Sequence, residues 1–179
     1  VGVGGNTKDI DSFYYPSRIR QSLVLTPQCD ISGFSTLTPD RVYYIPVAIT
    51  AAVNVKDVLA SVSTIGGGFA TGLYYDDGTG RPANYMTRSP GRTTVAAGLN
   101  TSPGLFTRTV YPGTGVIWIG IATESATATY LSSNYFSTMR TLYYETLAGG
   151  WTQLPTTATP VALAAGTVVP VASLLTSTS

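Results

Sequence analysis

The chain has 179 residues, only 11% of them charged, and a formal net charge of +1. An ordinary soluble domain carries roughly 25% charged residues, and nucleic-acid binding needs a basic stripe, so the composition argues against a nucleic-acid partner. Histidine is absent and Cys29 is the only cysteine, which excludes a Ser-His-Asp or Cys-His catalytic arrangement, a Cys/His zinc site and an internal disulfide.

The first 40 residues lack a regular hydrophobic period. Residues 1–6 are rich in glycine, residues 9–20 mix charges with aromatics, and residues 22–26 are a short predicted strand. We interpret residues 1–40 as an extended N-terminal arm that docks on a neighbouring protein. An equally good interpretation is a terminus that lies across its own domain. No run in the chain reaches the ~20 apolar residues of a membrane span, so we expect no membrane insertion.

From Arg41 onward, runs of β-branched and aromatic residues alternate with turn signals. The first predicted strands cover residues 42–49, 53–64 and 69–75, and Pro46 places the first of them at a sheet edge or a bulge. The period of two places four side chains of the third strand on one face: Phe69, Thr71, Leu73 and Tyr75. Residues 76–82 are a predicted turn, because their Asp-Gly pair supplies the positive φ that a tight reversal needs.

The remaining predicted strands cover residues 85–88, 104–111, 116–122, 139–147, 161–163 and 168–175. The strand at residues 116–122 is the most hydrophobic, and we expect it to be central. Turn signals recur about every 8–14 residues, the spacing typical of an all-β sandwich or barrel. No segment has a convincing helical period. The sequence therefore predicts an all-β fold with its main domain at residues 41–179.

Three segments carry a resemblance to a known family: residues 41–47 (RVYYIPV), 72–82 (GLYYDDGTGRP) and 112–120 (PGTGVIWIG). Together with the strand at residues 53–64, they resemble the jelly-roll modules of tail-fibre, tail-tip and other exposed virion proteins of tailed bacteriophages. In that family a strand ends in IY-D-x-G-x-P-G, and a later hairpin carries L-x-P-G-x-Y-W-L-A. Two residues depart from the pattern: Ala83 stands where the family has glycine, and Ile117 where it has an aromatic residue.

The resemblance implies an antiparallel jelly-roll β-sandwich that assembles as a homotrimer on the exposed surface of the virion. Its implied role is structural, in a tail fibre or in capsid decoration, with residues 1–40 contacting other virion proteins. Some members of the family bind host-surface saccharides. The alternative from another class is a carbohydrate-binding module of a secreted or cell-surface protein, which would need two or three coplanar surface aromatics.

Side chains suited to catalysis or metal binding are sparse. The nine carboxylates show no spacing that favours a paired-acid glycosidase site, so we expect neither an enzyme nor a cofactor. Asp76 and Asp77 could hold a hard cation, but the alternating ligands and distal Glu of an EF-hand loop are missing. We therefore favour a plain turn and predict no metal site.

The candidate contact residues are tyrosines, which occur as four adjacent pairs: Tyr14 and Tyr15, Tyr43 and Tyr44, Tyr74 and Tyr75, and Tyr143 and Tyr144. Neighbours in a strand point to opposite faces, so each strand pair places one ring inward and one outward. We weigh three roles for the outward rings: a subunit interface, cover for a sheet face, and stacking on a sugar.

Overall fold

The computed structural model describes residues 23–25, 31–49, 53–89, 92–94, 96–101, 108–110, 115–134 and 141–177. These residues form fifteen strands and no helix, so they contain none that could span a membrane. In chain order the strands are β1 (Leu23–Leu25), β2 (Ile31–Thr36), β3 (Arg41–Ala48), β4 (Val53–Thr64), β5 (Gly68–Asp76), β6 (Pro82–Arg88), β7 (Thr93–Thr94), β8 (Gly98–Thr101), β9 (Arg108–Val110), β10 (Val116–Thr123), β11 (Thr129–Asn134), β12 (Tyr143–Thr146), β13 (Val161–Ala162), β14 (Val168–Pro170) and β15 (Ala172–Ser177).

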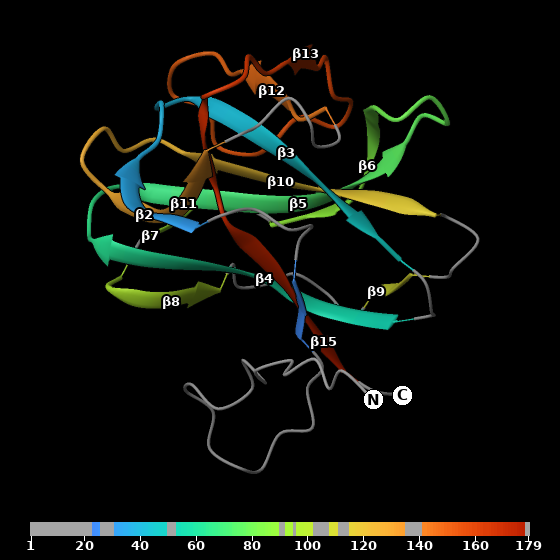
Figure 1. Ribbon diagram of the computed structural model, residues 1–179, viewed down its shortest axis with the longest axis horizontal. Helices are drawn as coiled ribbons and strands as arrows, with labels where there is room; N and C mark the ends of the chain where they lie inside the picture. Colours follow the sequence, from blue (N-terminus) through green and yellow to red (C-terminus); the bar gives the residue numbers. More distant parts are fainter. Residues whose placement is uncertain are drawn as a thin grey trace, which may run out of the picture.

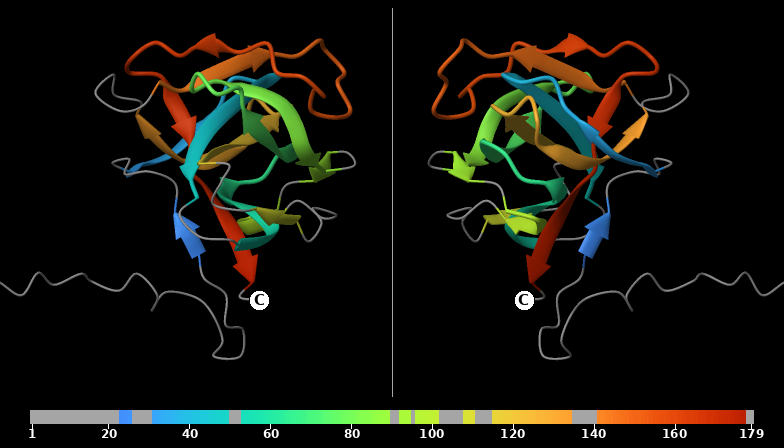
Figure 2. Two further views of the ribbon diagram at one scale, coloured as in Figure 1. Left: turned by 90° about the vertical axis from the view of Figure 1, so that its right-hand side faces the viewer. Right: turned by 90° about the vertical axis from the view of Figure 1, so that its left-hand side faces the viewer.

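The strands make two antiparallel sheets that pack face to face as a β-sandwich (Figures 1 and 2). The eight-stranded sheet has the order β1-β15-β4-β11-β14, with β2 paired to β11 and both β8 and β9 paired to β4. The seven-stranded sheet has the order β13-β12-β3-β10-β5-β6, with β7 paired to β5. The all-β prediction is confirmed.

Strand β10 lies at the centre of the seven-stranded sheet, between β3 and β5, as its hydrophobic sequence predicts. Its isoleucines point into the space between the sheets, which we call the central core. They pack there with Phe69 and Leu73 of β5, two of the four side chains predicted to share one face of that strand. The other large members of the central core come from both sheets and include Tyr43, Ile45, Val58, Val62, Tyr130 and Leu174.

Strand β3 explains why Pro46 is tolerated inside a sheet. Pro46 pairs with Trp118 of β10 on one side, whereas β12 pairs with β3 only from Arg41 to Tyr44 on the other. At Pro46 the strand therefore has a neighbour on one side only. Proline lacks an N–H to donate, and this open edge is where its absence costs least. The edge prediction therefore holds only for the part of the strand that contains Pro46, because β3 lies between β12 and β10 from Arg41 to Tyr44.

The described part of the first 40 residues belongs to the sandwich. Strand β1 pairs with β15, β2 pairs with β11, and Leu37 lies in the central core. The domain boundary predicted at residue 40 therefore moves toward the N-terminus, because residues 31–40 supply a strand and a core side chain. Residues 1–22 lie outside the described residues, and the docking arm stays a prediction for them.

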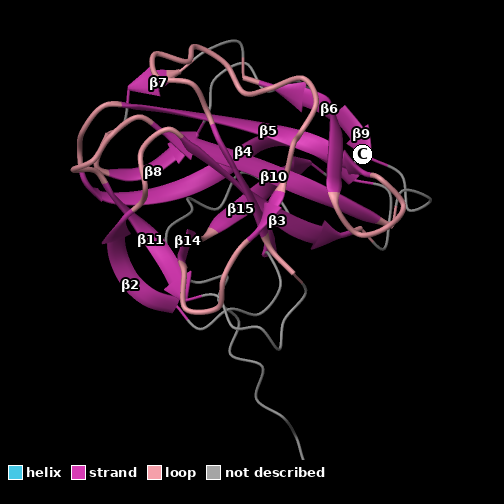
Figure 3. Ribbon diagram, turned by 90° about the horizontal axis from the view of Figure 1, so that it is seen from above, coloured by secondary structure: helices cyan, strands magenta, loops and turns pink. Residues whose placement is uncertain are grey.

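Residues 147–160, between β12 and β13, form a segment that we call the strap. It crosses the face of the seven-stranded sheet that points away from the other sheet (Figures 2 and 3). Trp151, Leu154 and Ala158 of the strap are buried there against the aromatic side chains of β3, β5 and β10. The seven-stranded sheet is thus covered on both faces, which explains why β10 reads as a nearly continuous apolar run.

Candidate functional site

The structure separates the predicted tyrosine pairs by sheet face. Tyr43 points into the central core, and its neighbour Tyr44 points to the strap side, as does Tyr74 of β5. This alternation was predicted, but Tyr44 and Tyr74 do not reach solvent, because the strap covers both rings completely. Neither ring is available for a surface contact in this fold. Tyr14 and Tyr15 lie outside the described residues.

The other paired tyrosines retain some access to solvent. Tyr75 is 37% exposed at the end of β5. Tyr143 is half-buried on the strap side, where its ring meets Trp118 edge-on at a centroid distance of 5.5 Å. Tyr144 is half-buried against the central core, and the Arg41 guanidinium stacks on its ring at 4.2 Å.

The hydroxyls of Tyr44 and Tyr74, the two tyrosines buried on the strap side, both have hydrogen-bond partners. The Tyr44 hydroxyl donates to Glu145 Oε2 at 2.9 Å, and the Tyr74 hydroxyl donates to the Pro155 carbonyl at 2.9 Å. The two rings meet edge to face, with centroids 5.1 Å apart. Burial raises the pKa of both hydroxyls, so they stay protonated donors. We call Tyr44, Tyr74, Trp118 and the strap residues packed on them the outer aromatic cluster.

The predicted turn at residues 76–82 is tied to this cluster through Asp76. One carboxylate oxygen, Oδ1, accepts the backbone N–H groups of Gly78 at 2.8 Å and Gly80 at 3.2 Å. The other oxygen, Oδ2, accepts the indole N–H of Trp118 at 3.0 Å. The same carboxylate thus shapes the turn and satisfies a buried donor.

Asp77 is used within the turn itself. Its Oδ1 accepts both the backbone N–H and the hydroxyl of Thr79, at 2.7 and 2.8 Å, and the Arg81 N–H at 3.2 Å. These hydrogen bonds, mainly those from Thr79, lower the pKa of the Asp77 carboxyl. Within the described residues no group of three or more Asp, Glu or Cys side chains could hold a metal ion. The contacts are those of a turn.

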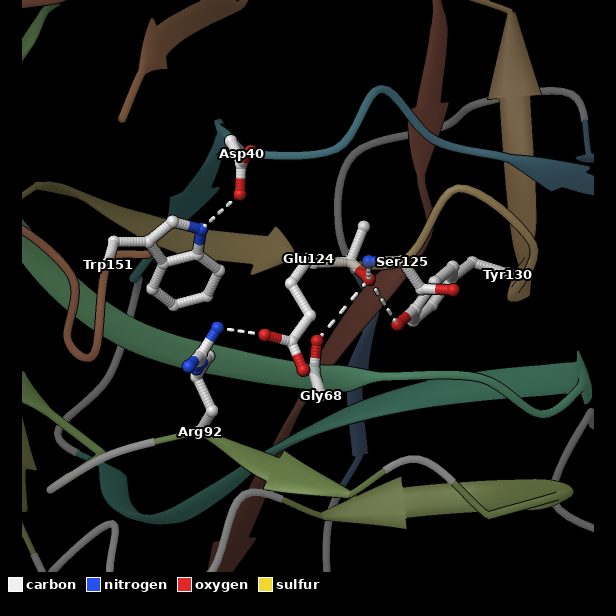
Figure 4. A network of polar contacts seen from close by, with 8 residues as sticks. Asp40, Gly68, Arg92, Glu124, Ser125, Tyr130 and Trp151 are labelled. Carbon is white, nitrogen blue, oxygen red and sulfur yellow. Dashed lines mark hydrogen bonds and ion pairs between the residues drawn. The ribbon is translucent and has the colours of Figure 1, made fainter. Parts of the chain in front are cut away.

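A second polar network lies at the end of the sandwich where β3 begins and β10 ends (Figure 4). The indole N–H of Trp151 donates to Asp40 Oδ1 at 2.8 Å, and the Arg92 guanidinium lies 5.3 Å from the Trp151 ring centroid. Arg92 also pairs with Glu124. Both charged side chains are partly exposed, so the ion pair contributes little to stability, on the order of 0–1 kcal/mol.

Deeper in this network, Thr123 connects the two sheets. Its hydroxyl lies 3.0 Å from the Tyr130 hydroxyl, which donates to it, and 3.4 Å from the Gly68 carbonyl. The Ser125 N–H also donates to the Thr123 hydroxyl, at 3.1 Å. Figure 4 shows Gly68, Ser125 and Tyr130 on one side of the partly exposed Arg92 and Glu124 pair, with Trp151 and Asp40 on the other. These hydrogen bonds connect the end of β10 to the start of β5, to the residues that follow β10 and to β11.

Asp40 is the anchor of this end of the sandwich. Its φ of 55° is in the left-handed region, its N–H donates to the Thr123 carbonyl, and its own carbonyl accepts from the Leu147 N–H. Asp40→Ala should lower the free energy of unfolding by about 1–3 kcal/mol, because the Trp151 donor loses its partner and alanine tolerates this φ poorly. Asp40→Asn keeps the oxygen and should cost clearly less. Urea denaturation measures both, and equal losses for the two variants would contradict this role of the carboxylate oxygen.

The exposed edge formed by β6 and the strap was not among the predicted sites. Tyr85 of β6 is 40% exposed, and the Arg88 guanidinium lies 4.9 Å from its ring centroid. Arg88 also donates to the Leu154 carbonyl of the strap. Nearby, the Thr157 hydroxyl donates to Asn84 Oδ1 at 2.9 Å. Sequence reasoning concentrated on adjacent tyrosines and missed this single ring, whose only sequence signal is an arginine three residues further on.

The arrangement as a whole offers a rigid surface with one exposed aromatic ring beside an arginine on the edge of β6. Such a surface is suited to binding. No protein-family model, curated protein or solved structure matches the chain.

Proposed function

We propose that the chain is a structural module of a tailed-bacteriophage virion, exposed on the particle as part of a fibre or as a capsid decoration. In this proposal the sandwich is a jelly roll, the module assembles as a homotrimer, and residues 1–22 contact other virion proteins. Adhesion to a host surface would follow from its exposed position. The sequence resemblance described above motivates the proposal.

The observation that carries the proposal is the order of eight strands. Within the eight-stranded sheet, β2, β11, β4 and β8 are neighbours in that order, and β3, β10, β5 and β6 are neighbours in the other sheet. Numbered along the chain, these orders are 1-8-3-6 and 2-7-4-5. The double Greek key of a jelly roll, an architecture of viral capsid and lectin domains, would have these two strand orders, so the pairing supports the proposal.

The internal use of polar groups also supports a structural role. The carboxylates of Asp76 and Asp77 shape a turn, that of Glu145 accepts from Tyr44, and that of Asp40 accepts from Trp151. These carboxylates accept hydrogen bonds from the protein's own turns and aromatic side chains. This use favours the interpretation as a rigid structural module over that as a catalytic one. A rigid module suits a particle in which many copies give avidity to weak contacts.

The mass of the purified chain in solution, measured by light scattering, tests the assembly. We expect a stable trimer. Antibodies raised against the chain should also label intact phage particles that carry this sequence, as seen by electron microscopy. A monomer would contradict the homotrimer, and particles that stay unlabelled would contradict the virion assignment.

The carbohydrate-binding module is the second candidate, and the exposed ring of Tyr85 favours it. Such modules bind sugar on two or three coplanar surface aromatics. Tyr44 and Tyr74 lie on the face where such a platform would form, but the strap covers both rings. This burial makes the virion module the better proposal. If the chain were a monomer and were secreted as part of a protein with a catalytic domain, the carbohydrate-binding module would become the better proposal.

A further inference from the structure

The ring of Tyr85 differs in solvent exposure from the ring of its cross-strand partner. Tyr85 pairs with Tyr74 of β5, and Tyr74 is completely buried whereas Tyr85 is 40% exposed. The strap packs over Tyr74, whereas at Tyr85 it hydrogen-bonds to the β6 backbone and the Tyr85 side chain stays partly exposed. An exposed aromatic ring on a rigid strand offers flat apolar area with a polar hydroxyl at its end.

The backbone on both sides of this ring is fixed. The Tyr85 N–H donates to the Thr156 carbonyl at 2.9 Å, and the Ala158 N–H donates to the Ala83 carbonyl at 2.9 Å. The strap thus extends the sheet beyond β6 at this point. A ligand that stacks on the ring would find it already ordered, so binding would cost little conformational entropy.

Arg88 places a positive charge beside the ring. Its guanidinium stacks on Tyr85 and donates to the Leu154 carbonyl. Arg92 and Glu124 form the one ion pair found among the described residues, so no described carboxylate pairs with Arg88. A guanidinium has five N–H donors in a planar fork that matches a carboxylate. The donors of Arg88 that do not contact Leu154 are therefore suited to an acidic group on a ligand.

The rim of the patch is neutral and polar. Asn84 of β6 and Thr156 and Thr157 of the strap are exposed next to Tyr85, where the Thr156 carbonyl accepts from the Tyr85 N–H and the Thr157 hydroxyl donates to Asn84. The other exposed large apolar side chains in the described residues are Phe34 on β2, Ile65 after β4, Tyr75 on β5 and Val161 on β13. Tyr75 follows Tyr74 in β5 and therefore points to the opposite face of the sheet from Tyr74. A protein interface needs a contiguous apolar centre, which a single ring does not provide. One ring bordered by hydroxyl and amide groups matches a sugar, which has an apolar ring face and a polar rim.

We propose that Tyr85 and Arg88 bind a saccharide that carries a carboxylate, with the sugar ring on Tyr85 and its acidic group at Arg88. The inference rests on the proposed function, because it supplies the contact through which an exposed virion module would adhere to a host surface.

Arg81 provides a matched control at the other end of the same edge. It too donates to a strap carbonyl, that of Pro160 at 3.0 Å, and its guanidinium lies 5.6 Å from the Tyr143 ring centroid. It differs from Arg88 in lying next to Asp77, whose carboxyl has its pKa lowered in part by the Arg81 charge. Losing Arg81 should affect the strap as losing Arg88 does, without affecting a ligand on Tyr85.

The experiment is a binding measurement on the full chain with immobilised oligomers of galacturonate and glucuronate, and with galactose and glucose oligomers as neutral counterparts. We expect binding to at least one uronate oligomer, weaker binding to the neutral ones, and a decrease as salt is raised. Tyr85→Ala and Arg88→Gln should each weaken binding by about tenfold or more. Tyr85→Phe and Arg81→Gln should stay within about twofold of the wild type. Thermal unfolding of every variant establishes that the fold is intact.

Several results would overturn the inference. One is wild-type binding that Tyr85→Ala leaves unchanged, and another is equal losses for Arg88→Gln and Arg81→Gln. Self-association that disappears with Tyr85→Ala would place a second copy of the chain on this ring instead. If no uronate oligomer binds, the inference fails while the trimer mass and particle labelling can still support the virion module, so the two failures are distinguishable.

Discussion

Trp118→Ala should lower the free energy of unfolding by about 3–5 kcal/mol, the largest loss we expect from a single substitution. Trp118 is completely buried at the centre of the outer aromatic cluster, in the central strand β10. Removing the indole opens a large cavity between the sheet and the strap. It also deprives Asp76 Oδ2 of its indole donor, so the turn at residues 76–82 is weakened as well.

Urea denaturation followed by far-UV circular dichroism measures this loss, with all variants at one protein concentration because assembly would add to the apparent stability. Trp118→Phe is the matched control, since it fills most of the space but cannot donate to Asp76. We expect it to cost about 1–3 kcal/mol. A loss below about 1 kcal/mol for Trp118→Ala, the size typical of surface positions, would show that the strap does not bury this ring in solution.

Gly120→Ala should cost about 1–3 kcal/mol although it adds only one methyl group. Gly120 lies two residues after Trp118 in β10, on the strap side of the sheet. A Cβ there would be 2.7 Å from Cε2 of Tyr74 and 3.5 Å from Cδ1 of Leu154. The Tyr74 ring cannot move away easily, because its hydroxyl donates a hydrogen bond to the Pro155 carbonyl and the ring packs edge to face with Tyr44.

Gly149→Ala is the control for this substitution, because a Cβ at Gly149 of the strap meets nothing within 4 Å. Its effect should stay within about 0.5 kcal/mol of zero. A double-mutant cycle with Tyr74→Ala identifies the cause, since the extra methyl should cost almost nothing once the Tyr74 ring is gone. A cost of Gly120→Ala that persists in the Tyr74→Ala background would place the clash elsewhere.

The strands that the sequence predicted best are those with strong local signals. The period of two and the flanking turn residues predicted residues 53–64 and 69–75, which are β4 and β5. The Asp-Gly turn at residues 76–82 has the contacts expected of it, with a φ of 86° at Gly78. These features depend on neighbours in the chain, and local sequence is sufficient to specify them.

Other strands were predicted at the wrong length or as one element instead of two. Residues 139–147 were predicted as a strand, but within the described residues only Tyr143–Thr146 pair, as β12, because β3 and β13 are its partners there. Residues 168–175 divide into β14 and β15 at Val171, whose N–H donates to the Leu131 carbonyl of β11. The ends of these strands are set by the extent of the neighbouring strand with which each one pairs. The periodicity of the sequence does not predict the pairing partner.

The sequence by itself determined the all-β class, the turn at residues 76–82, the central position of β10 and the alternation of Tyr43 with Tyr44 across a sheet. These follow from side-chain period, composition and turn chemistry, all of which act over a few residues. Only the tertiary structure decided which outward rings reach solvent. The strap lies about 100 residues along the chain from Tyr44, yet it buries Tyr44 and Tyr74 and leaves Tyr85 exposed. The burial of a side chain depends on segments that are distant in the sequence and pack against it. The alternation of side chains along a strand predicts only the sheet face to which each one points.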